Sequence, residues 1–232
     1  MKSSNQTLGF YNHNAEAYAD KTRGADMKEA IVPLRYGNTN TFLVQGCQGS
    51  LLVDTDYAGT MQGFYRALKA NGIRLDQISL MMATHYHPDH CGLIGKLQEQ
   101  GVRLLLPDSQ AEAVHFPDAI FAREKRDFAA VDPAKAVIIS TDESRAFLKR
   151  IGIEGEIIRT PSHSADSVSL ILDDGNCFVG DLEPYEYIAA YAEHAQLRED
   201  WERVMSRQPK IVYYAHAPAR AFHIAASGAP AL

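Results

Sequence analysis

Four side chains that can bind a metal ion lie within six consecutive residues of this chain: His85, His87, Asp89 and His90. Imidazole nitrogens and carboxylate oxygens are ligands that suit Zn²⁺, and they also bind iron and manganese. The apolar residues 78–84 directly precede them and predict a buried strand. Because α/β folds usually carry their chemistry at the carboxyl ends of strands, we expect part of a metal site at this edge of a sheet.

Three further candidate ligands follow strands that the sequence predicts later in the chain. His163 comes after residues 156–159, Asp181 ends the run 177–181, and His216 follows residues 211–214. The glycine before Asp181 permits a close approach of another part of the chain. A single histidine after a strand is usually an ordinary surface or core residue. Seven such groups at strand ends indicate one shared site.

The elements that must position these groups follow from the periodicity of apolar residues. Alternating or continuous apolar runs predict strands, and apolar residues three and four apart predict helices. The predicted strands are residues 31–36, 41–44, 50–54, 78–84, 103–106, 137–139, 156–159, 168–172, 177–179 and 211–214. The predicted helices are residues 59–71, 93–101, 140–151 and a segment around 197–205. This order, strands and helices twice over, predicts two packed sheets with helices outside.

The composition indicates the class of protein and excludes some partners. The chain has 232 residues, 46% of them hydrophobic, which suits one globular domain over residues 31–232. We interpret residues 1–30 as an N-terminal extension that acts as a lid or as an arm in a homodimer. A net charge of -6 argues against nucleic acid, since phosphate binding needs clustered Lys and Arg. Without a hydrophobic signal core or an apolar run of ~18 residues, we expect a cytoplasmic protein with no membrane partner.

The three cysteines, Cys47, Cys91 and Cys177, are odd in number and widely spaced. This pattern predicts reduced thiols and no disulfide framework. Cys91 directly follows His90, and we interpret it as a small buried residue. A ligand or redox role is the alternative interpretation.

The complete set of candidate ligands resembles the metallo-β-lactamase superfamily. The motif of that family is His-x-His-x-Asp-His, followed by a distant His, an Asp after Gly and a late His. The matching residues here are His85, His87, Asp89, His90, His163, Asp181 and His216. The resemblance covers roughly residues 31–220, and includes Asp54, whose family counterpart typically supports the metal site. It implies an α/β fold, a four-layer αββα sandwich of two mixed β-sheets with helices on the outer faces.

Two positions depart from the family pattern. Asp56 stands where the family often has Gly, and Ser164–Ala165 follow His163 where Thr-Pro or Thr-Ala is commoner. Neither position is a direct metal ligand in the family, so the expected ligand set remains complete.

The resemblance also assigns the ligands to two metal ions. One ion would be held by His85, His87 and His163, the second by Asp89, His90 and His216, and Asp181 would bridge them. We expect two Zn²⁺, with iron or manganese as alternatives. Two such ions about 3.5–4 Å apart can share a hydroxide, because each lowers the pKa of bound water towards ~7. That hydroxide attacks a carbonyl or phosphoryl centre, and Asp89 is the candidate catalytic residue that orients it.

The choice of substrate follows from exclusions within the superfamily. His87 argues against the flavodiiron oxygen reductases, which usually have Glu there. Asp181 argues against zinc β-lactamases, which generally lack a bridging Asp. The length and acidic balance argue against the nucleases. Glyoxalase II-like thioesterases, lactonases and related small-ester hydrolases remain, although the short tail after His216 departs from glyoxalase II.

The leading hypothesis is therefore a dinuclear metal-dependent hydrolase of a small ester, thioester or lactone. One alternative is a mononuclear iron oxidoreductase of the persulfide dioxygenase type, for which His85, His163 and Asp181 supply a ligand set. Another is a metal-binding sensor protein with little turnover. Phe116, Phe121 and Phe128, in the irregular segment 107–135, are candidates for a substrate wall, with helix packing as the alternative. Tyr86 and one of Tyr213 and Tyr214 are further candidates for substrate contact, because strand alternation turns the last two to opposite faces.

Overall fold

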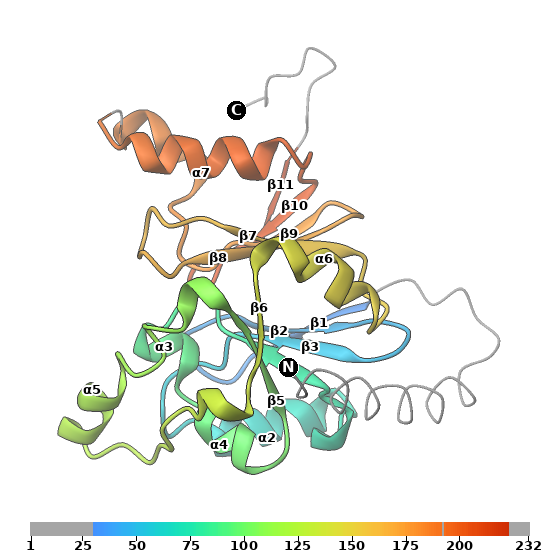
Figure 1. Cartoon of the computed structure of the whole chain (residues 1–232), viewed down its shortest axis with the longest axis vertical. Coiled ribbons are helices and arrows are strands. Elements are labelled where there is room, and N and C mark those ends of the chain that lie inside the picture. The colour runs from blue at the N-terminus through green and yellow to red at the C-terminus, as the bar shows by residue number, and fades with distance from the viewer. Residues whose placement is uncertain (1–29, 192, 223–232) are drawn as a thin grey trace, which may run out of the picture.

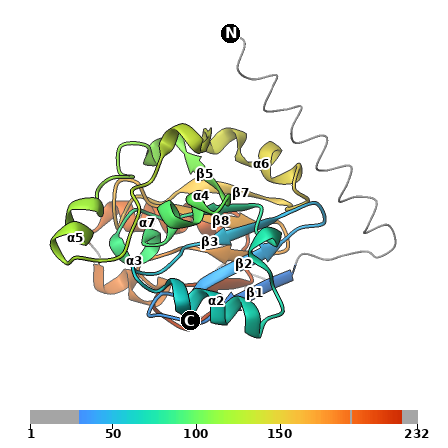
Figure 2. The same ribbon diagram turned by 90° about the horizontal axis from the view of Figure 1, so that it is seen from below.

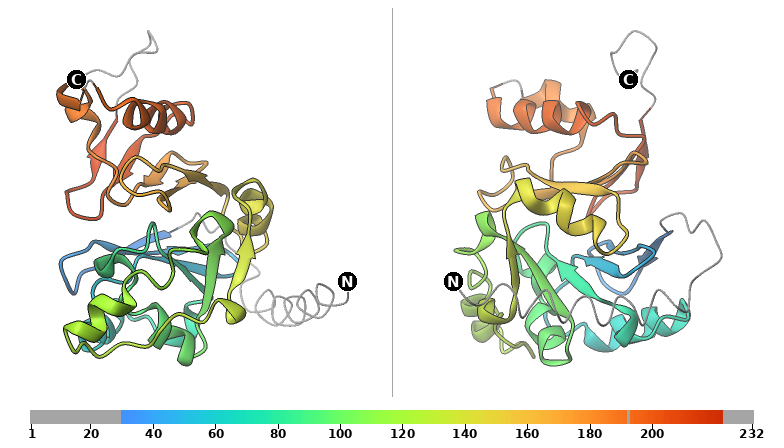
Figure 3. Two further views of the ribbon diagram at one scale, coloured as in Figure 1. Left: turned by 60° about the vertical axis from the view of Figure 1, so that its left-hand side comes forward. Right: turned by 45° about the vertical axis from the view of Figure 1, so that its right-hand side comes forward.

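The computed structural model describes residues 30–191 and 193–222. The hypothesis of a lid or dimer arm in residues 1–30 therefore falls outside the described residues, apart from Ala30. In the described part, two β-sheets lie face to face, with helices on both outer faces (Figure 3).

The first sheet has six strands in the order of the chain. They are β1 (Ala30–Leu34), β2 (Thr41–Gln45), β3 (Ser50–Val53), β4 (Leu80–Met82), β5 (Arg103–Pro107) and β6 (Val137–Ile139). The first three strands pair antiparallel, whereas β3 to β6 pair parallel, so the sheet is mixed.

The second sheet has five strands in the order β11-β10-β9-β8-β7. They are β7 (Gly155–Arg159), β8 (Val168–Leu172), β9 (Asn176–Phe178), β10 (Ile211–Tyr213) and β11 (Arg220–Ala221). β9 and β10 are parallel and the other pairs are antiparallel, so this sheet is mixed as well.

The core between the sheets follows from the alternation of side chains along the strands. Leu51 and Val53 of β3 lie in one buried cluster with Phe178 of the second sheet. Leu52, between them, points to the opposite face and lies in a cluster with Phe64 of a covering helix. Period-2 alternation thus gives one strand two apolar contacts, one to the other sheet and one to the helices.

The helices complete the layers. α2 (Met61–Ala70) and α4 (Ile94–Glu99) lie against the outer face of the first sheet (Figure 2). α7 (Ala195–Met205) covers the second sheet (Figure 1) with Leu197, Trp201 and Val204, the helical stripe that the sequence predicts. α6 (Thr141–Lys149) begins with the capping box of Ser140 and Glu143 and packs beside β7. The predicted four-layer αββα fold is confirmed.

The shorter elements lie mostly in the connections. They are the helices α3 (Pro88–Cys91) and α5 (Asp118–Arg123), and the 3-10 helices η1 (Leu75–Gln77), η2 (Asp108–Gln110), η3 (Pro133–Lys135) and η4 (Tyr185–Tyr191). The predicted strand 78–84 is shortened at both ends to the three residues of β4. The two-residue strand β11 is too short to give a periodic signal. No helix of the described residues has the length and apolarity to cross a membrane.

Candidate metal centre

The histidine-rich run follows β4 and folds into a tight turn and the single helical turn α3. His87 is the N-cap of that turn and Pro88 is its first residue, a position where a missing N–H costs no hydrogen bond. Asp89 and His90 then follow within the same turn. His85 and His90 are buried and His87 and Asp89 are half-buried, so the run presents ligand atoms at the bottom and the rim of one site.

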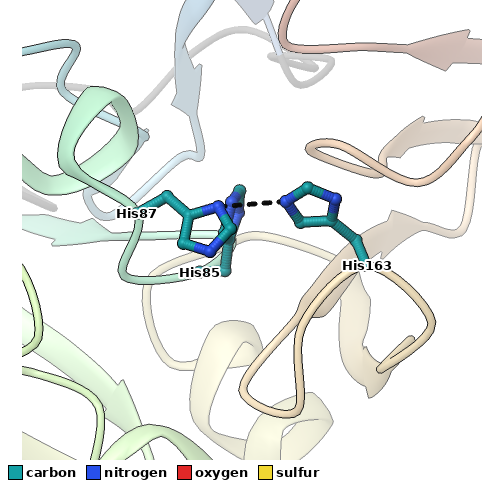
Figure 4. A group of neighbouring side chains, drawn as sticks. All are labelled: His85, His87 and His163. Atoms are coloured by element: carbon teal, nitrogen blue, oxygen red, sulfur yellow. Dashed lines mark hydrogen bonds between the residues drawn. The ribbon is translucent and has the colours of Figure 1, made fainter.

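The described side chains form three groups with the spacing of metal ligands: two separate triads, and a third group of His85, His90 and Asp181 that overlaps both. His85, His87 and His163 offer nitrogen atoms that lie within 4.8 Å of one another. Figure 4 shows His163 facing His87 from the opposite loop, with Nε2 3.1 Å from Nδ1 of His87. Asp89, His90 and His216 make the second triad within the same 4.8 Å limit. These groupings match the two ligand sets that the family resemblance implies.

Asp181 lies between the two triads. Its Oδ2 is 3.9 Å from Nε2 of His85 and 3.6 Å from Nε2 of His163, both in the first triad. Its Oδ1 is 3.4 Å from Nε2 of His216, and its Oδ2 is 3.4 Å from Nε2 of His90, both in the second triad. One carboxylate therefore reaches members of both triads, the arrangement that a bridging ligand requires.

The donor atoms fit divalent metal ions. Nε2 of His85 and Nε2 of His90 are buried and have no hydrogen-bond partner among the described residues. Leaving a buried polar atom unpaired costs about 1–3 kcal/mol, which a coordinated ion would offset. The orientations of two imidazole rings also suit metal binding. Nδ1–H of His90 donates to Oδ2 of Asp54 at 3.0 Å, and Nδ1–H of His216 donates to the carbonyl of Asn38 at 3.3 Å. Both rings thus present Nε2 to the site.

Asp54 is the buried anchor of this arrangement. It follows β3 with a φ of 60°, a left-handed conformation that Asp tolerates better than most residues. Its carboxylate accepts hydrogen bonds from the backbone N–H of Thr84 at 2.7 Å and from the Thr84 hydroxyl at 3.1 Å, as well as from His90. Asp54 therefore joins the ends of β3 and β4 and orients His90, the supporting role that its family counterpart has.

The charges of the site are strongly coupled. The hydrogen bond with His216 lowers the pKa of Asp89 to about 2, against the opposing effect of burial. Burial would lower the pKa of His90, but the charge of Asp54 and contact with Asp181 raise it to about 10. Burial also lowers the pKa of His85, and the charge of His90 adds to this effect. Since a metal competes with protons for the imidazole nitrogens, metal binding here would release the proton of His90.

Two polar residues that the sequence interpretation missed, the buried Gln110 and the half-buried Asp166, tie the ligand loops together. Nε2 of Gln110, on η2, lies within hydrogen-bond distance of the carbonyls of Ala83, Thr84 and Asp166 at 3.1, 3.2 and 3.0 Å. Oδ2 of Asp166 accepts from the backbone N–H of Tyr86 at 2.7 Å. These bonds fix the loop of His85 and His87 to the loop of His163. Gln110 lies in an irregular segment, where no periodic pattern marks a buried polar residue.

A third polar residue, which is fully buried, fixes the other side of the His163 loop. Asp200 of α7 is fully buried and accepts a hydrogen bond from the backbone N–H of Ser162 at 2.7 Å. Arg203 donates to the same carboxylate at 3.0 Å, which balances its charge. The helical stripe predicted the buried face of α7, but it gave no signal for this polar contact.

Gly180 lies where the second sheet approaches the first. Its φ is 58°, and a Cβ at this position would lie 2.5 Å from Oγ1 of Thr84. This is the close approach that the sequence predicts for the glycine before Asp181.

Replacing Gly180 by alanine should therefore displace Thr84 or Asp181 and reduce both metal content and thermal stability. Gly72→Ala is the matched control, because Gly72 has a φ of 68° but nothing within 4 Å of its would-be Cβ. The left-handed backbone penalty, roughly 1–2 kcal/mol, is common to both variants. Equal melting temperatures and equal metal contents in the two variants would contradict the steric role of Gly180.

The other residues singled out in the sequence lie in different environments. Cys91 is buried in the core below the site and belongs to neither triad, as expected for a small buried residue. All three cysteines are free. The Tyr86 side chain is buried in the same core, so it does not face a substrate. Tyr214 is buried under α7, whereas Tyr213 lines a cavity beside His216, as strand alternation requires.

The three phenylalanines of the segment 107–135 also differ in environment: some pack in the core and one is exposed beside the candidate site. Phe121 is buried and packs against Phe128 and Tyr57, which is ordinary core packing. Phe116 is 56% exposed, and its ring centroid lies 5.7 Å from that of His87. Only Phe116 of the three therefore lies at the rim of the candidate site with an apolar face open to solvent.

Asp56, which departs from the family pattern, adopts a glycine-like backbone conformation and accepts hydrogen bonds with its carboxylate. Its φ is 58°, a conformation that glycine adopts most easily and that Asp tolerates. The Asp56 carboxylate accepts hydrogen bonds from the backbone N–H groups of Tyr57 at 2.5 Å and Thr39 at 3.5 Å. The aspartate thus keeps the backbone conformation and adds bonds to the loop between β1 and β2.

Known proteins resemble this chain in sequence and in fold. The model of the metallo-beta-lactamase superfamily matches residues 34–216. A probable metallo-hydrolase of Methanocaldococcus jannaschii is 30% identical over 141 residues, which cover 60% of this chain and 65% of that protein. The beta-lactamase-like protein 2 homolog of Drosophila melanogaster is 23% identical over 180 residues, covering 77% of this chain and 58% of that protein. The chain thus spans less than two thirds of either relative.

The fold has solved counterparts. The crystal structure of a metallo-beta-lactamase family protein from Thermus thermophilus has a TM-score of 0.62 at 20% identity, and the match covers 84% of this chain and 74% of that one. The family match includes all seven candidate ligands, and the two mixed sheets bring them to one edge. The chain belongs to the metallo-β-lactamase superfamily.

Proposed function

We propose that this protein is a hydrolase of a small ester, thioester or lactone that depends on two divalent metal ions. Members of its superfamily are generally metal-dependent hydrolases. The observation that carries the two-ion proposal is the position of Asp181, whose carboxylate lies within 3.9 Å of nitrogen atoms from both triads. His85, His87 and His163 would hold one ion, and Asp89, His90 and His216 the other.

In such a site the metal ions and the side chains would contribute different parts of the reaction. Divalent ions, when bound, supply a low pKa for water and a Lewis acid for the substrate carbonyl. The chain fixes the rings of His90 and His216 through Asp54 and Asn38. Asp89 is ionised at neutral pH, as an ordinary aspartate is, and contact with His216 lowers its pKa further, to about 2. Its carboxylate can accept a hydrogen bond from the attacking water and so orient it.

A second candidate function is supported by a smaller set of the same residues. Oδ2 of Asp181 lies 3.9 Å from His85 and 3.6 Å from His163, so two histidines and one carboxylate could hold a single iron. Such a set suits an iron oxidoreductase. The complete second triad of Asp89, His90 and His216 favours the two-ion hydrolase.

Metal analysis of the purified chain should find about two divalent ions per molecule. A chelator should remove both ions and abolish hydrolysis of esters, thioesters or lactones, and added Zn²⁺ should restore it. His87→Ala should retain one ion and lose most turnover, while the matched variant His115→Ala, at an exposed histidine outside both triads, should retain both. One iron per chain, with no second metal and no hydrolysis, would instead favour the oxidoreductase.

A further inference from the structure

A cavity of about 520 Å³ adjoins the candidate metal centre. It lies between the β1–β2 hairpin and the end of β10, and His216 lines it. His216 also belongs to the second ligand triad, so the cavity and the metal centre share a wall. The volume is in the range of pockets that bind small molecules.

The lining of this cavity is mostly apolar but contains one permanent positive charge. Ile31, Pro33, Phe42 and Tyr213 supply apolar surface. Arg35 is the one Lys, Arg, Asp or Glu among the lining residues, and none of the ion pairs within residues 30–191 and 193–222 involves it. An arginine at an apolar wall, with no carboxylate from the described chain, offers its fork of donors to an anion from outside.

The loop that follows Arg35 is held firmly against the metal centre. Oγ1 of Thr39 donates to the carbonyl of Asp89 at 2.7 Å, and the carbonyl of Asn38 accepts from Nδ1 of His216 at 3.3 Å. The side chain of Asn40 donates to the carbonyls of Tyr214 and Ala217 at 2.9 and 3.0 Å. The backbone next to Arg35 is therefore positioned relative to two candidate ligands before any substrate binds.

Contact with Asp56 also holds the loop between β1 and β2 in place. A Cβ at Gly37 would overlap the Asp56 carboxylate, so the two residues are closely packed. A preorganised loop of this kind binds a ligand without the cost of ordering the backbone.

We propose that this cavity is the subsite for a carboxylate-bearing part of the substrate. The carboxylate pairs with Arg35, the carbon chain lies on Phe42 and Tyr213, and the scissile carbonyl lies beyond His216 at the metal centre. This proposal rests on the proposed function and narrows it to esters, thioesters or lactones of acids that carry a second, free carboxylate. Charge complementarity favours this occupant, because the exposed guanidinium of Arg35 forms no ion pair within the described residues and can pair with a carboxylate of the substrate.

Two 4-nitrophenyl esters of matched shape test the proposal. The monoester of adipic acid carries a free carboxylate, and the 6-methylheptanoate ester replaces that carboxylate by an isopropyl group. The metal-loaded protein should have a kcat/KM about 10- to 100-fold higher for the anionic ester, as expected for one charge-assisted hydrogen-bonded pair. Arg35→Ala should remove this preference, because kcat/KM for the anionic ester should fall at least tenfold more than kcat/KM for the neutral ester. Arg35→Lys should retain part of the preference, and Arg66→Ala, at an exposed arginine of α2, should retain all of it.

Binding of adipate itself, measured by calorimetry, separates the subsite from the reaction. Wild type should bind adipate at least tenfold more tightly than Arg35→Ala does, and the two proteins should bind the neutral diamide adipamide equally. Equal ester preferences and equal adipate affinities in the two proteins would overturn the subsite while hydrolysis stands. A protein that hydrolyses neither ester but shows the Arg35-dependent adipate binding would retain the subsite and contradict the proposed function.

Discussion

Asp181→Ala should lose hydrolytic turnover by about 100-fold or more and retain fewer than two metal ions per chain. The reason is the position of the Asp181 carboxylate, which lies 3.4 Å from nitrogen atoms of both His90 and His216 and 3.6 Å from that of His163. Loss of even an outer partner of a metal ligand typically costs about 10- to 100-fold in affinity or activity. Initial rates on the best ester of a panel, together with metal analysis of the same preparation, measure both effects.

A matched control separates the loss of this carboxylate from the loss of any surface charge. Asp142→Ala removes an exposed carboxylate in the first turn of α6, remote in sequence from every candidate ligand, and should leave rate and metal content unchanged. Full turnover in Asp181→Ala with two ions still bound would show that the carboxylate does not bridge them.

Asp54→Ala should produce the largest loss of stability of any single change near the site. It would remove the acceptor of His90 Nδ1–H and of the Thr84 backbone N–H, all of which are buried. Breaking a buried charged pair by removing one partner typically costs about 3–5 kcal/mol. Denaturant unfolding of the metal-free protein should show a decrease of this size, and metal analysis should show weaker retention of the second ion.

Asp54→Asn distinguishes the hydrogen bonds from the charge. Asn tolerates the φ of 60° and keeps one oxygen acceptor, so the variant should lose less stability than Asp54→Ala. It should still bind the second ion less tightly, because a neutral amide is a weaker acceptor than a carboxylate for His90 Nδ1–H. Equal unfolding free energies for wild type, Asp54→Asn and Asp54→Ala would refute the anchoring role.

Much of the fold and of the ligand set could be predicted because both leave a local pattern. The alternation in residues 50–53 and the helical stripe of Leu197, Trp201 and Val204 follow from which face of each element is buried. The four groups in residues 85–90 are close in sequence and therefore close in space in any compact fold. His163, Asp181 and His216 could be added because each follows a recognisable strand.

The contacts that shape the site could not be predicted in the same way, because they join residues far apart in the chain. Thr39 binds Asp89 across 50 positions, Tyr86 binds Asp166 across 80, and His216 binds Asn38 across 178. No periodic pattern in one segment carries information about a partner in another. The same holds for Arg35, which is an ordinary polar residue in sequence and lines a cavity only because the hairpin lies against β10.

The sequence by itself therefore determined which residues are candidate metal ligands, since the ligand types and their strand-end positions are local properties. The tertiary structure decided how these residues are arranged. Packing of the two sheets brings the ends of β4, β9 and β10 together, and only then does one carboxylate reach both triads and one arginine adjoin the metal centre. The physical reason is that strand and helix formation depend on near neighbours, whereas a site depends on distances that the packed core alone fixes.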